Sequence, residues 1–158
     1  ARLSVRVGVA IDVGAQRMRL RYLTWTFGAL VLPVNAGGGP HVAARVVEIR
    51  SYNLKAGTRE RFHQLFERDA LPLLRRWNVD VVAYGASLHD STSYFLMRSF
   101  SSVEDRQRSE DAFYGSAEWR NGPREAILAA IEGYTTVVIQ LEDATVAGLR
   151  RTMTRGPD

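Results

Sequence analysis

The sequence contains no cysteine. Disulfide bonds, thiolate metal sites and cysteine nucleophiles are therefore excluded. The compartment stays open, because an exported protein can also lack disulfides. Long hydrophobic runs are scarce too: the apolar stretch Tyr22–Val34 is shorter than the roughly 20 residues that a transmembrane helix needs, so we expect no integral membrane segment in the mature domain.

Sequence motifs for nucleotide binding and hydrolysis are absent as well. There is no dinucleotide fingerprint, HExxH zinc motif or nucleophile elbow, and the run Gly37–Gly39 is not followed by the Lys-Ser/Thr of a phosphate loop. The histidines, His41, His63 and His89, are far apart and fall on a linker, a helix and a hairpin. We therefore predict neither a metal site nor a cofactor.

The composition is that of a folded globular protein. Of 158 residues, 46% are hydrophobic and 24% are charged, which is typical of one domain. The net charge of +4 and the pI of about 9.8 would suit nucleic acid or an acidic membrane surface. However, the arginines are scattered over predicted helices, without zinc-finger spacing or an RNA-binding aromatic pattern. We predict an arginine-rich solvated surface and no nucleic-acid partner.

Residues 1–40 lie outside the predicted core domain. Met18–Arg21 is basic, Tyr22–Val34 is apolar and a small-residue stretch follows, which is the order of a secretory signal peptide. Two interpretations stay open: a signal peptide that begins at Met18, or an extension attached to the domain. The first predicts an exported or periplasmic protein and the second a cytoplasmic one. In both, Gly37–Gly39 belongs to a linker.

From residue 41 to residue 145 the hydrophobic pattern alternates between the period of a strand and that of a helix. Short β-branched runs bounded by turn residues predict four strands. These strands span Val46–Asn53, Asp80–Ser87, Ser93–Phe100 and Thr135–Leu141.

Helices are predicted between these strands. The first follows Thr58, and Pro72 should kink or restart it because proline lacks a backbone donor. The second opens with the capping box Ser102–Asp105, and the third begins at Pro123. Residues 146–158 carry only a weak apolar pattern and are expected to form a frayed tail.

The predicted order is strand, helix, strand, strand, helix, strand, with an extra helix before the last strand. This order is typical of a ferredoxin-like α+β fold with an antiparallel four-stranded sheet. Helices on one face leave the other face uncovered, yet the second and fourth strands carry apolar residues on both faces. A second copy would bury this surplus. We therefore expect a homodimer whose two sheets pack face to face.

Four motifs between residues 46 and 141 carry a family resemblance. They are Glu48–Gly57, with its E-I-R-S-Y and L-K-A-G segments, Leu71-Pro72, Ser102–Arg106 and Ser116–Trp119. In this order and spacing they resemble the NIPSNAP family, one branch of the dimeric α+β barrels. The passage Trp77–Asp80 departs from the pattern, because relatives more often have a glycine-containing turn before the second strand.

The resemblance implies a dimeric α+β barrel but no particular activity, because the family has no secure common one. Eukaryotic members are linked to membrane trafficking and to mitochondria. Related dimeric barrels include small monooxygenases and isomerases, which use the cavity between the sheet and the helices. This cavity is therefore where a site is expected.

Charged residues on the predicted strands point to the same cavity. Alternation places Glu48, Arg50 and Tyr52 on one face of the first strand. Arg98 lies on the third strand, on one face with Tyr94, Leu96 and Phe100. A guanidinium in such surroundings needs an acceptor. The pattern indicates either a salt bridge, with Glu48 as the expected partner of Arg98, or a bound ligand.

Further candidates come from the second strand and the helices. Val82 and Tyr84 lie on the second strand, and Arg106 enters the second helix where the family resemblance is clearest. Trp119, like Trp77, is interpreted first as a core or interface aromatic. No catalytic residue is assigned. The predicted ligand-binding residues are Glu48, Arg50, Tyr52, Tyr84, Arg98, Arg106 and Trp119.

Two classes of function fit these features. One is a NIPSNAP-like module that binds a small hydrophobic or acidic molecule, or a partner, without catalysis. The other is a cofactor-free barrel enzyme of the monooxygenase or isomerase type that acts on a small hydrophobic substrate. An unpaired carboxylate or histidine in an apolar pocket would favour the enzyme. A filled barrel in which Arg98 is bridged to Glu48 would favour the module.

Overall fold

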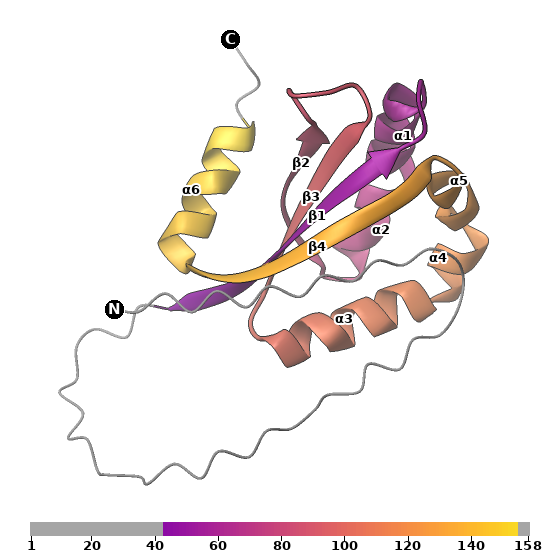
Figure 1. Cartoon of the computed structure of the whole chain (residues 1–158). Helices are drawn as coiled ribbons and strands as arrows, with labels where there is room; N and C mark the ends of the chain where they lie inside the picture. Colours follow the sequence, from indigo (N-terminus) through magenta and orange to yellow (C-terminus); the bar gives the residue numbers. More distant parts are fainter. Residues whose placement is uncertain (1–42, 155–158) are drawn as a thin grey trace, which may run out of the picture.

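The computed structural model describes residues 43–154 (Figure 1), so the expected signal segment and linker lie outside the described residues. A four-stranded antiparallel sheet forms the centre of the domain, with the order β2-β3-β1-β4. This order confirms the predicted ferredoxin-like α+β fold. The strands are β1 (Ala44–Leu54), β2 (Asp80–Ala86), β3 (Ser93–Phe100) and β4 (Ile131–Glu142).

One face of the sheet packs against the helices that lie between the strands in sequence. The predicted helices are present, and the segment before β4 forms two short helices. These elements are α1 (Arg59–Leu65), the π-helical turn η1 (Phe66–Ala70), α2 (Leu71–Arg76), α3 (Val103–Gly115), α4 (Ala117–Asn121) and α5 (Arg124–Ala129).

The first helical segment runs through α1, η1 and α2 without a break. Gly57, at φ 75°, makes the turn that leads into it. Pro72 has no N–H, and its ring excludes the regular hydrogen bond to the preceding turn. The chain widens into the π-helical turn η1 just before this proline. The predicted restart at Pro72 is therefore a π-helical turn inside one continuous helical segment.

Serine caps set the positions of α3 and α4. Ser102 Oγ accepts from the backbone N–H of Asp105 at 3.1 Å, as the capping box predicts. Ser116 Oγ accepts from the N–H of Trp119, also at 3.1 Å. Each cap satisfies a backbone donor that a helix start would otherwise leave unpaired. The caps thereby fix where Arg106 and Trp119 enter the interior.

The main core is aromatic and lies between the sheet and this helical layer. Tyr52 and Tyr94 from the strands pack against Phe62 and Phe66 of the first helical segment. The ring centroids of Phe62 and Tyr94 are 5.0 Å apart in an edge-on arrangement, which aromatic pairs favour. Phe113 is the buried aromatic that α3 contributes.

The opposite face of the sheet is partly covered by a sixth helix, α6 (Asp143–Thr154). The expected frayed tail is wrong for residues 146–154, which belong to this helix. Val146 is 2% exposed and packs with Val47 of β1 in a second, smaller core. Arg150 also donates to both carboxylate oxygens of Asp80 on β2, each at 2.6 Å. Helix α6 has only a weak apolar pattern and gains its stability from these tertiary contacts.

A bulge in β2 corrects the placement of Val82. The register with β3 shifts between Val81 and Ala83, so one extra residue stands in β2. Val82 consequently packs in the smaller core on the α6 side, whereas Tyr84 packs against the main core. Val82, offered with Tyr84 as a cavity candidate from the sequence, therefore lies on the other side of the sheet.

Candidate ligand pocket and buried ion network

Five charged side chains from two strands and one helix form a cluster that we call the ion network. Glu48 and Arg50 come from β1, Arg98 comes from β3, and Arg106 and Glu110 come from α3. The three strand residues project toward the helical layer, and the two α3 residues meet them from the helix side. Glu48 and Arg98 are fully buried, at 0% exposed, and Arg50 and Glu110 are each 9% exposed.

Glu48 is the centre of the network. Its Oε1 accepts from Arg98 Nη2, and its Oε2 accepts from Arg106 Nε. Arg50 Nε lies 2.9 Å from the same Oε1, without the alignment of a hydrogen bond. The predicted pairing of Arg98 with Glu48 is therefore confirmed, and it is one part of a larger cluster.

Glu110 provides the second carboxylate. Its Oε1 accepts from Arg50 Nη2 at 2.5 Å and also from Arg98 Nη2. Its Oε2 lies 2.9 Å from Arg106 Nη2, one helical turn earlier on α3. The two carboxylates are thus bridged by the same three guanidinium groups.

The ion network contains more donors and more positive charge than its carboxylates can match. With three arginines and two glutamates, its formal charge is +1 when both carboxylates are ionised. Within residues 43–154, Arg50 Nε and Arg98 Nε are buried and make no hydrogen bond. Burying unmatched charge is costly.

The two carboxylates respond differently to these surroundings. Burial would raise the pKa of Glu48, but the charges of Arg50, Arg98 and Arg106 outweigh it and lower that pKa to about 2. Burial raises the pKa of Glu110, the negative charge of Glu48 adds to the effect, and the arginines offset it only in part. Glu48 is therefore the firmly ionised member of the network.

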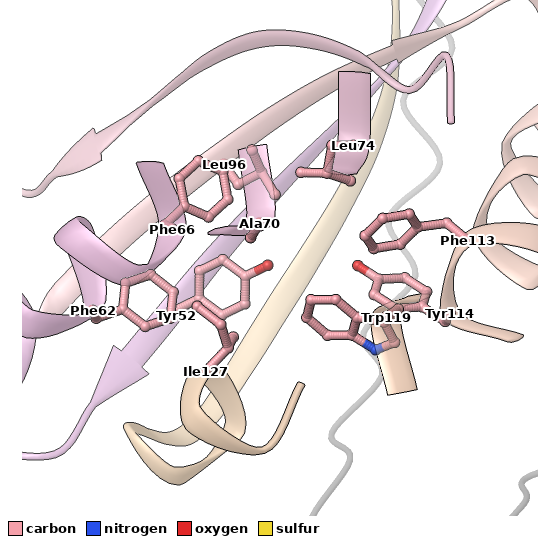
Figure 2. A pocket seen from close by; sticks show the side chains of 10 residues that line it. All are labelled: Tyr52, Phe62, Phe66, Ala70, Leu74, Leu96, Phe113, Tyr114, Trp119 and Ile127. Atoms are coloured by element: carbon pink, nitrogen blue, oxygen red, sulfur yellow. The ribbon is translucent and has the colours of Figure 1, made fainter. Parts of the chain in front are cut away.

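A pocket opens beside the network, between the sheet and the helices (Figure 2). The cavity itself is small, about 30 Å³, which is room for roughly one or two water molecules, so a larger ligand requires the surrounding side chains to move. Its walls are aromatic and aliphatic, with two tyrosine hydroxyls as the polar side-chain groups that Figure 2 shows facing the space. The lining residues are Tyr52, Phe62, Phe66, Ala70, Leu74, Leu96, Phe113, Tyr114, Trp119 and Ile127.

Tyr114 joins the pocket to the ion network. Its ring lines the pocket, and its hydroxyl oxygen accepts from Arg50 Nη1 at 2.9 Å and from Arg98 Nη1 at 3.2 Å. The same two arginine side chains lie 5.5 and 5.8 Å from the centre of its ring. Electrostatic effects of the buried network therefore reach the pocket through this phenol.

Tyr52 supplies the second hydroxyl. Figure 2 shows the hydroxyls of Tyr52 and Tyr114 directed toward each other across the space. Burial raises the pKa of Tyr52 to about 12, although the charge of Arg50 opposes the shift. Tyr52 is thus a neutral phenol near neutral pH and keeps its proton for donation.

The predicted ligand-binding residues divide into three groups. Glu48, Arg50, Arg98 and Arg106 meet in the ion network, as described above. Tyr52 and Trp119 line the pocket. Tyr84 does neither: its hydroxyl donates to Glu67 at 3.1 Å near the surface, and it is not part of the pocket wall.

Two important residues were missed by the sequence analysis, Glu110 and Tyr114. A signal was present, because Arg106, Glu110 and Tyr114 recur at intervals of four residues and share one face of α3. In the sequence alone, the mixed charges of this helix suit a solvated face equally well. The sheet converts that charged face into a buried one.

Among residues 43–154, no group of three or more His, Asp or Glu side chains is placed to hold a metal ion. Within the same part, no helix is both long and apolar enough to cross a membrane.

The fold and the site together define a ferredoxin-like α+β domain with a pocket between its sheet and its helices. Residues 47–140 match the family model of NIPSNAP. The chain belongs to the NIPSNAP family, which confirms the resemblance carried by its motifs.

Solved structures of NIPSNAP proteins share this fold. A NIPSNAP family protein of unknown function from Agrobacterium tumefaciens is 20% identical, with 65% of this chain and 92% of that chain covered at a TM-score of 0.60. A NIPSNAP-like domain protein from Burkholderia xenovorans is 21% identical, with 63% and 85% covered at a TM-score of 0.57. No curated protein matches the chain. These likenesses establish the fold and assign no activity.

Proposed function

We propose that this domain is a non-catalytic module that binds a small, mostly apolar molecule in the pocket between its sheet and its helices. The observation that carries the proposal is the aromatic pocket whose wall includes Tyr52 and Tyr114. Pockets of this kind, apolar with a few convergent polar groups, are the usual sites of small-molecule binding. The polar groups orient the ligand, and the rings supply most of the contact area.

The described pocket wall holds no ready proton acceptor, which favours binding over catalysis. None of the lining residues within the described chain is a carboxylate, a histidine or a lysine. The nearby carboxylates Glu48 and Glu110 are engaged by arginines. A cofactor-free enzyme would need a group to accept a proton from its substrate. The alternative of a barrel monooxygenase or isomerase therefore has less support.

We also propose that two copies associate through the sheet face that α6 covers only in part. Ile49, Met97 and Ile139 on this face are only partly buried within one copy. Their burial against a second sheet would add favourable apolar area. The dimer would leave the pocket on the helix side of each copy.

A pocket-filling variant tests the proposed function. Ala70 is 3% exposed and lines the pocket, so Ala70→Leu places additional side-chain atoms where a ligand would lie. Ala112→Leu makes the same change at an exposed position of α3 and is the control. We expect titration calorimetry with one-ring aromatic probes to show binding to the wild type and to Ala112→Leu, and at least tenfold weaker binding to Ala70→Leu.

Absence of binding by every aromatic probe would contradict the proposed pocket. Equal binding by Ala70→Leu and the wild type would place the ligand elsewhere. Turnover of a probe by the wild type, detected by mass spectrometry of the recovered molecule, would favour the enzyme instead.

A further inference from the structure

We infer that the pocket selects a ligand with an oxygen acceptor, above all an aromatic or branched carboxylate, and that the Tyr114 hydroxyl donates the selecting hydrogen bond. This inference rests on the proposed function, because it specifies the ligand of the same pocket. It follows from the hydrogen bonds that this hydroxyl already makes, which occupy its lone pairs and leave its proton free.

A tyrosine hydroxyl has one proton to donate and two lone pairs with which to accept. Arg50 Nη1 and Arg98 Nη1 can only donate, and both donate to the Tyr114 oxygen, at 2.9 and 3.2 Å. The lone pairs are therefore in use and the proton is not. Because the ring of Tyr114 forms part of the pocket wall and its hydroxyl faces the space in Figure 2, this proton is available to a ligand.

The two guanidinium groups also make this proton a stronger donor than that of an ordinary tyrosine. A guanidinium cation at each lone pair draws electron density from the phenol. Hydrogen bonds that share an atom in this way polarise one another. Arg98 is completely buried and Arg50 nearly so, which means that water screens little of this effect. The arrangement is suited to an acceptor that carries negative charge.

Tyr52 contributes a second donor to the same space. Its pKa of about 12 keeps the phenol protonated, and Figure 2 shows its hydroxyl facing that of Tyr114. A carboxylate has two oxygens and could accept from both phenols at once. A ketone or aldehyde oxygen could accept from them with less electrostatic gain.

The charge of the ion network disfavours the opposite class of ligand. Its formal charge is +1, and among the described residues Arg50 Nε and Arg98 Nε are buried and make no hydrogen bond. An ammonium group in the pocket would meet this charge and would find no free lone pair on Tyr114. Cationic ligands of equal shape are therefore excluded by charge, not by size.

A series of probes with nearly equal shape tests the inference on the intact wild-type chain. Benzoate, acetophenone, cumene and 1-phenylethylammonium share a ring with a branched substituent, but present an anionic acceptor, a neutral acceptor, no acceptor and a cation. We expect benzoate to bind at least roughly tenfold more tightly than cumene, since a hydrogen bond to a charged group is of that size. Acetophenone should fall between them, and the ammonium probe should bind more weakly than cumene.

Tyr114→Phe removes the donor and keeps the ring in the wall. In this variant benzoate should lose its advantage and bind about as weakly as cumene, while the affinity for cumene changes less than threefold. Tyr134→Phe is the matched control: Tyr134 also stacks near Arg50, at 5.1 Å from its guanidinium to the ring centre, but does not line the pocket. It should leave the order of the probes unchanged.

The outcomes separate this inference from the proposed function. If cumene and benzoate bind the wild type equally, the pocket is real and the selection through Tyr114 is wrong. If no probe binds, the proposed function itself fails. If Tyr114→Phe does not fold, as judged by circular dichroism, the order of the four probes on the wild type still decides the inference.

Discussion

Glu48 and Arg98 lie directly opposite each other on neighbouring antiparallel strands, and neither is exposed to solvent. Their side chains are neighbours because the register aligns the two positions, and water screens little of the attraction between their opposite charges because both are buried. Glu48 also pairs with Arg50 of β1 and Arg106 of α3, and Arg98 also pairs with Glu110 of α3. Loss of one member should therefore disturb the charge balance of the whole cluster.

Removal of Glu48 should be the most destabilising change in the ion network. Glu48→Leu would leave three arginines around one carboxylate, and we expect a loss of about 3–5 kcal/mol, as for other broken buried pairs. Adding Arg98→Met removes one surplus cation, so the double variant should recover part of that loss. Urea unfolding followed by circular dichroism measures both.

Arg68→Ala is the control for these ion-network variants, because Arg68 pairs with Asp69 on the surface. We expect it to change stability by no more than about 1 kcal/mol. If Glu48→Leu were as mild as Arg68→Ala, the buried network would contribute little to folding. A strictly additive double variant would show that Glu48 and Arg98 are not coupled.

The lowered pKa of Glu48 predicts a particular dependence of stability on pH. The ordinary value is 4.5 and the folded value is about 2, so the unfolded chain takes up this proton first as the pH falls. The stabilisation is therefore fully present above pH 4.5 and is lost as the pH falls toward 2. We expect the unfolding free energy of Glu48→Gln to decline less steeply in this window than that of the wild type.

Glu110→Gln distinguishes this effect from general acid unfolding. Burial raises the pKa of Glu110, so below pH 4.5 this group is protonated in both the folded and the unfolded chain and adds little slope there. The Glu110 variant should keep the wild-type slope between pH 4.5 and 2. Equal slopes for the wild type and Glu48→Gln would contradict the predicted role of Glu48.

Tyr84 should not contribute to ligand binding, despite its place in the sequence-based set. Its hydroxyl donates to Glu67, outside the pocket wall. Tyr84→Phe should therefore bind benzoate as the wild type does, whereas Tyr52→Phe should bind it several-fold more weakly through loss of a donor. Calorimetry on the two variants, which differ only in which hydroxyl is removed, makes the comparison. If only Tyr84→Phe bound benzoate more weakly, the binding site would have to lie nearer to β2 than proposed.

Helix α6 should be an integral part of the domain. Val146 is 2% exposed, so Val146→Asp would bury a charge without a partner, and we expect it to cost at least about 2 kcal/mol. Thr145→Asp places the same charge on the exposed side of α6 and should have little effect. Hydrogen exchange of the α6 amides gives an independent measure. Rapid exchange in the wild type would show that the helix is not stably docked.

The proposed homodimer predicts a doubled mass in light scattering at micromolar concentration. Ile139→Lys places a charge on the partly covered sheet face and should shift the protein toward monomer. Gln140→Lys, an exposed position on the next residue of β4, points to the other face and should leave the mass unchanged. A monomeric wild type would contradict the dimer.

The sequence by itself determined the strands, most of the helices and the pairing of Glu48 with Arg98. Alternation along β1 and β3 is a local property, and it places alternate side chains on one face whatever the rest of the chain does. The ferredoxin-like order then makes these two strands neighbours. A buried arginine among apolar residues also requires an acceptor, so a charged cluster followed from local pattern and electrostatics.

Only the tertiary structure decided which further residues complete that cluster. A solvated charged face and a buried one have the same pattern in sequence, and packing of α3 against the sheet makes Glu110 and Tyr114 internal. The bulge that turns Val82 to the α6 side, and the contacts that stabilise α6, likewise depend on partners far away in the chain. Long-range packing, which local periodicity does not encode, therefore determined the shape and chemistry of the pocket.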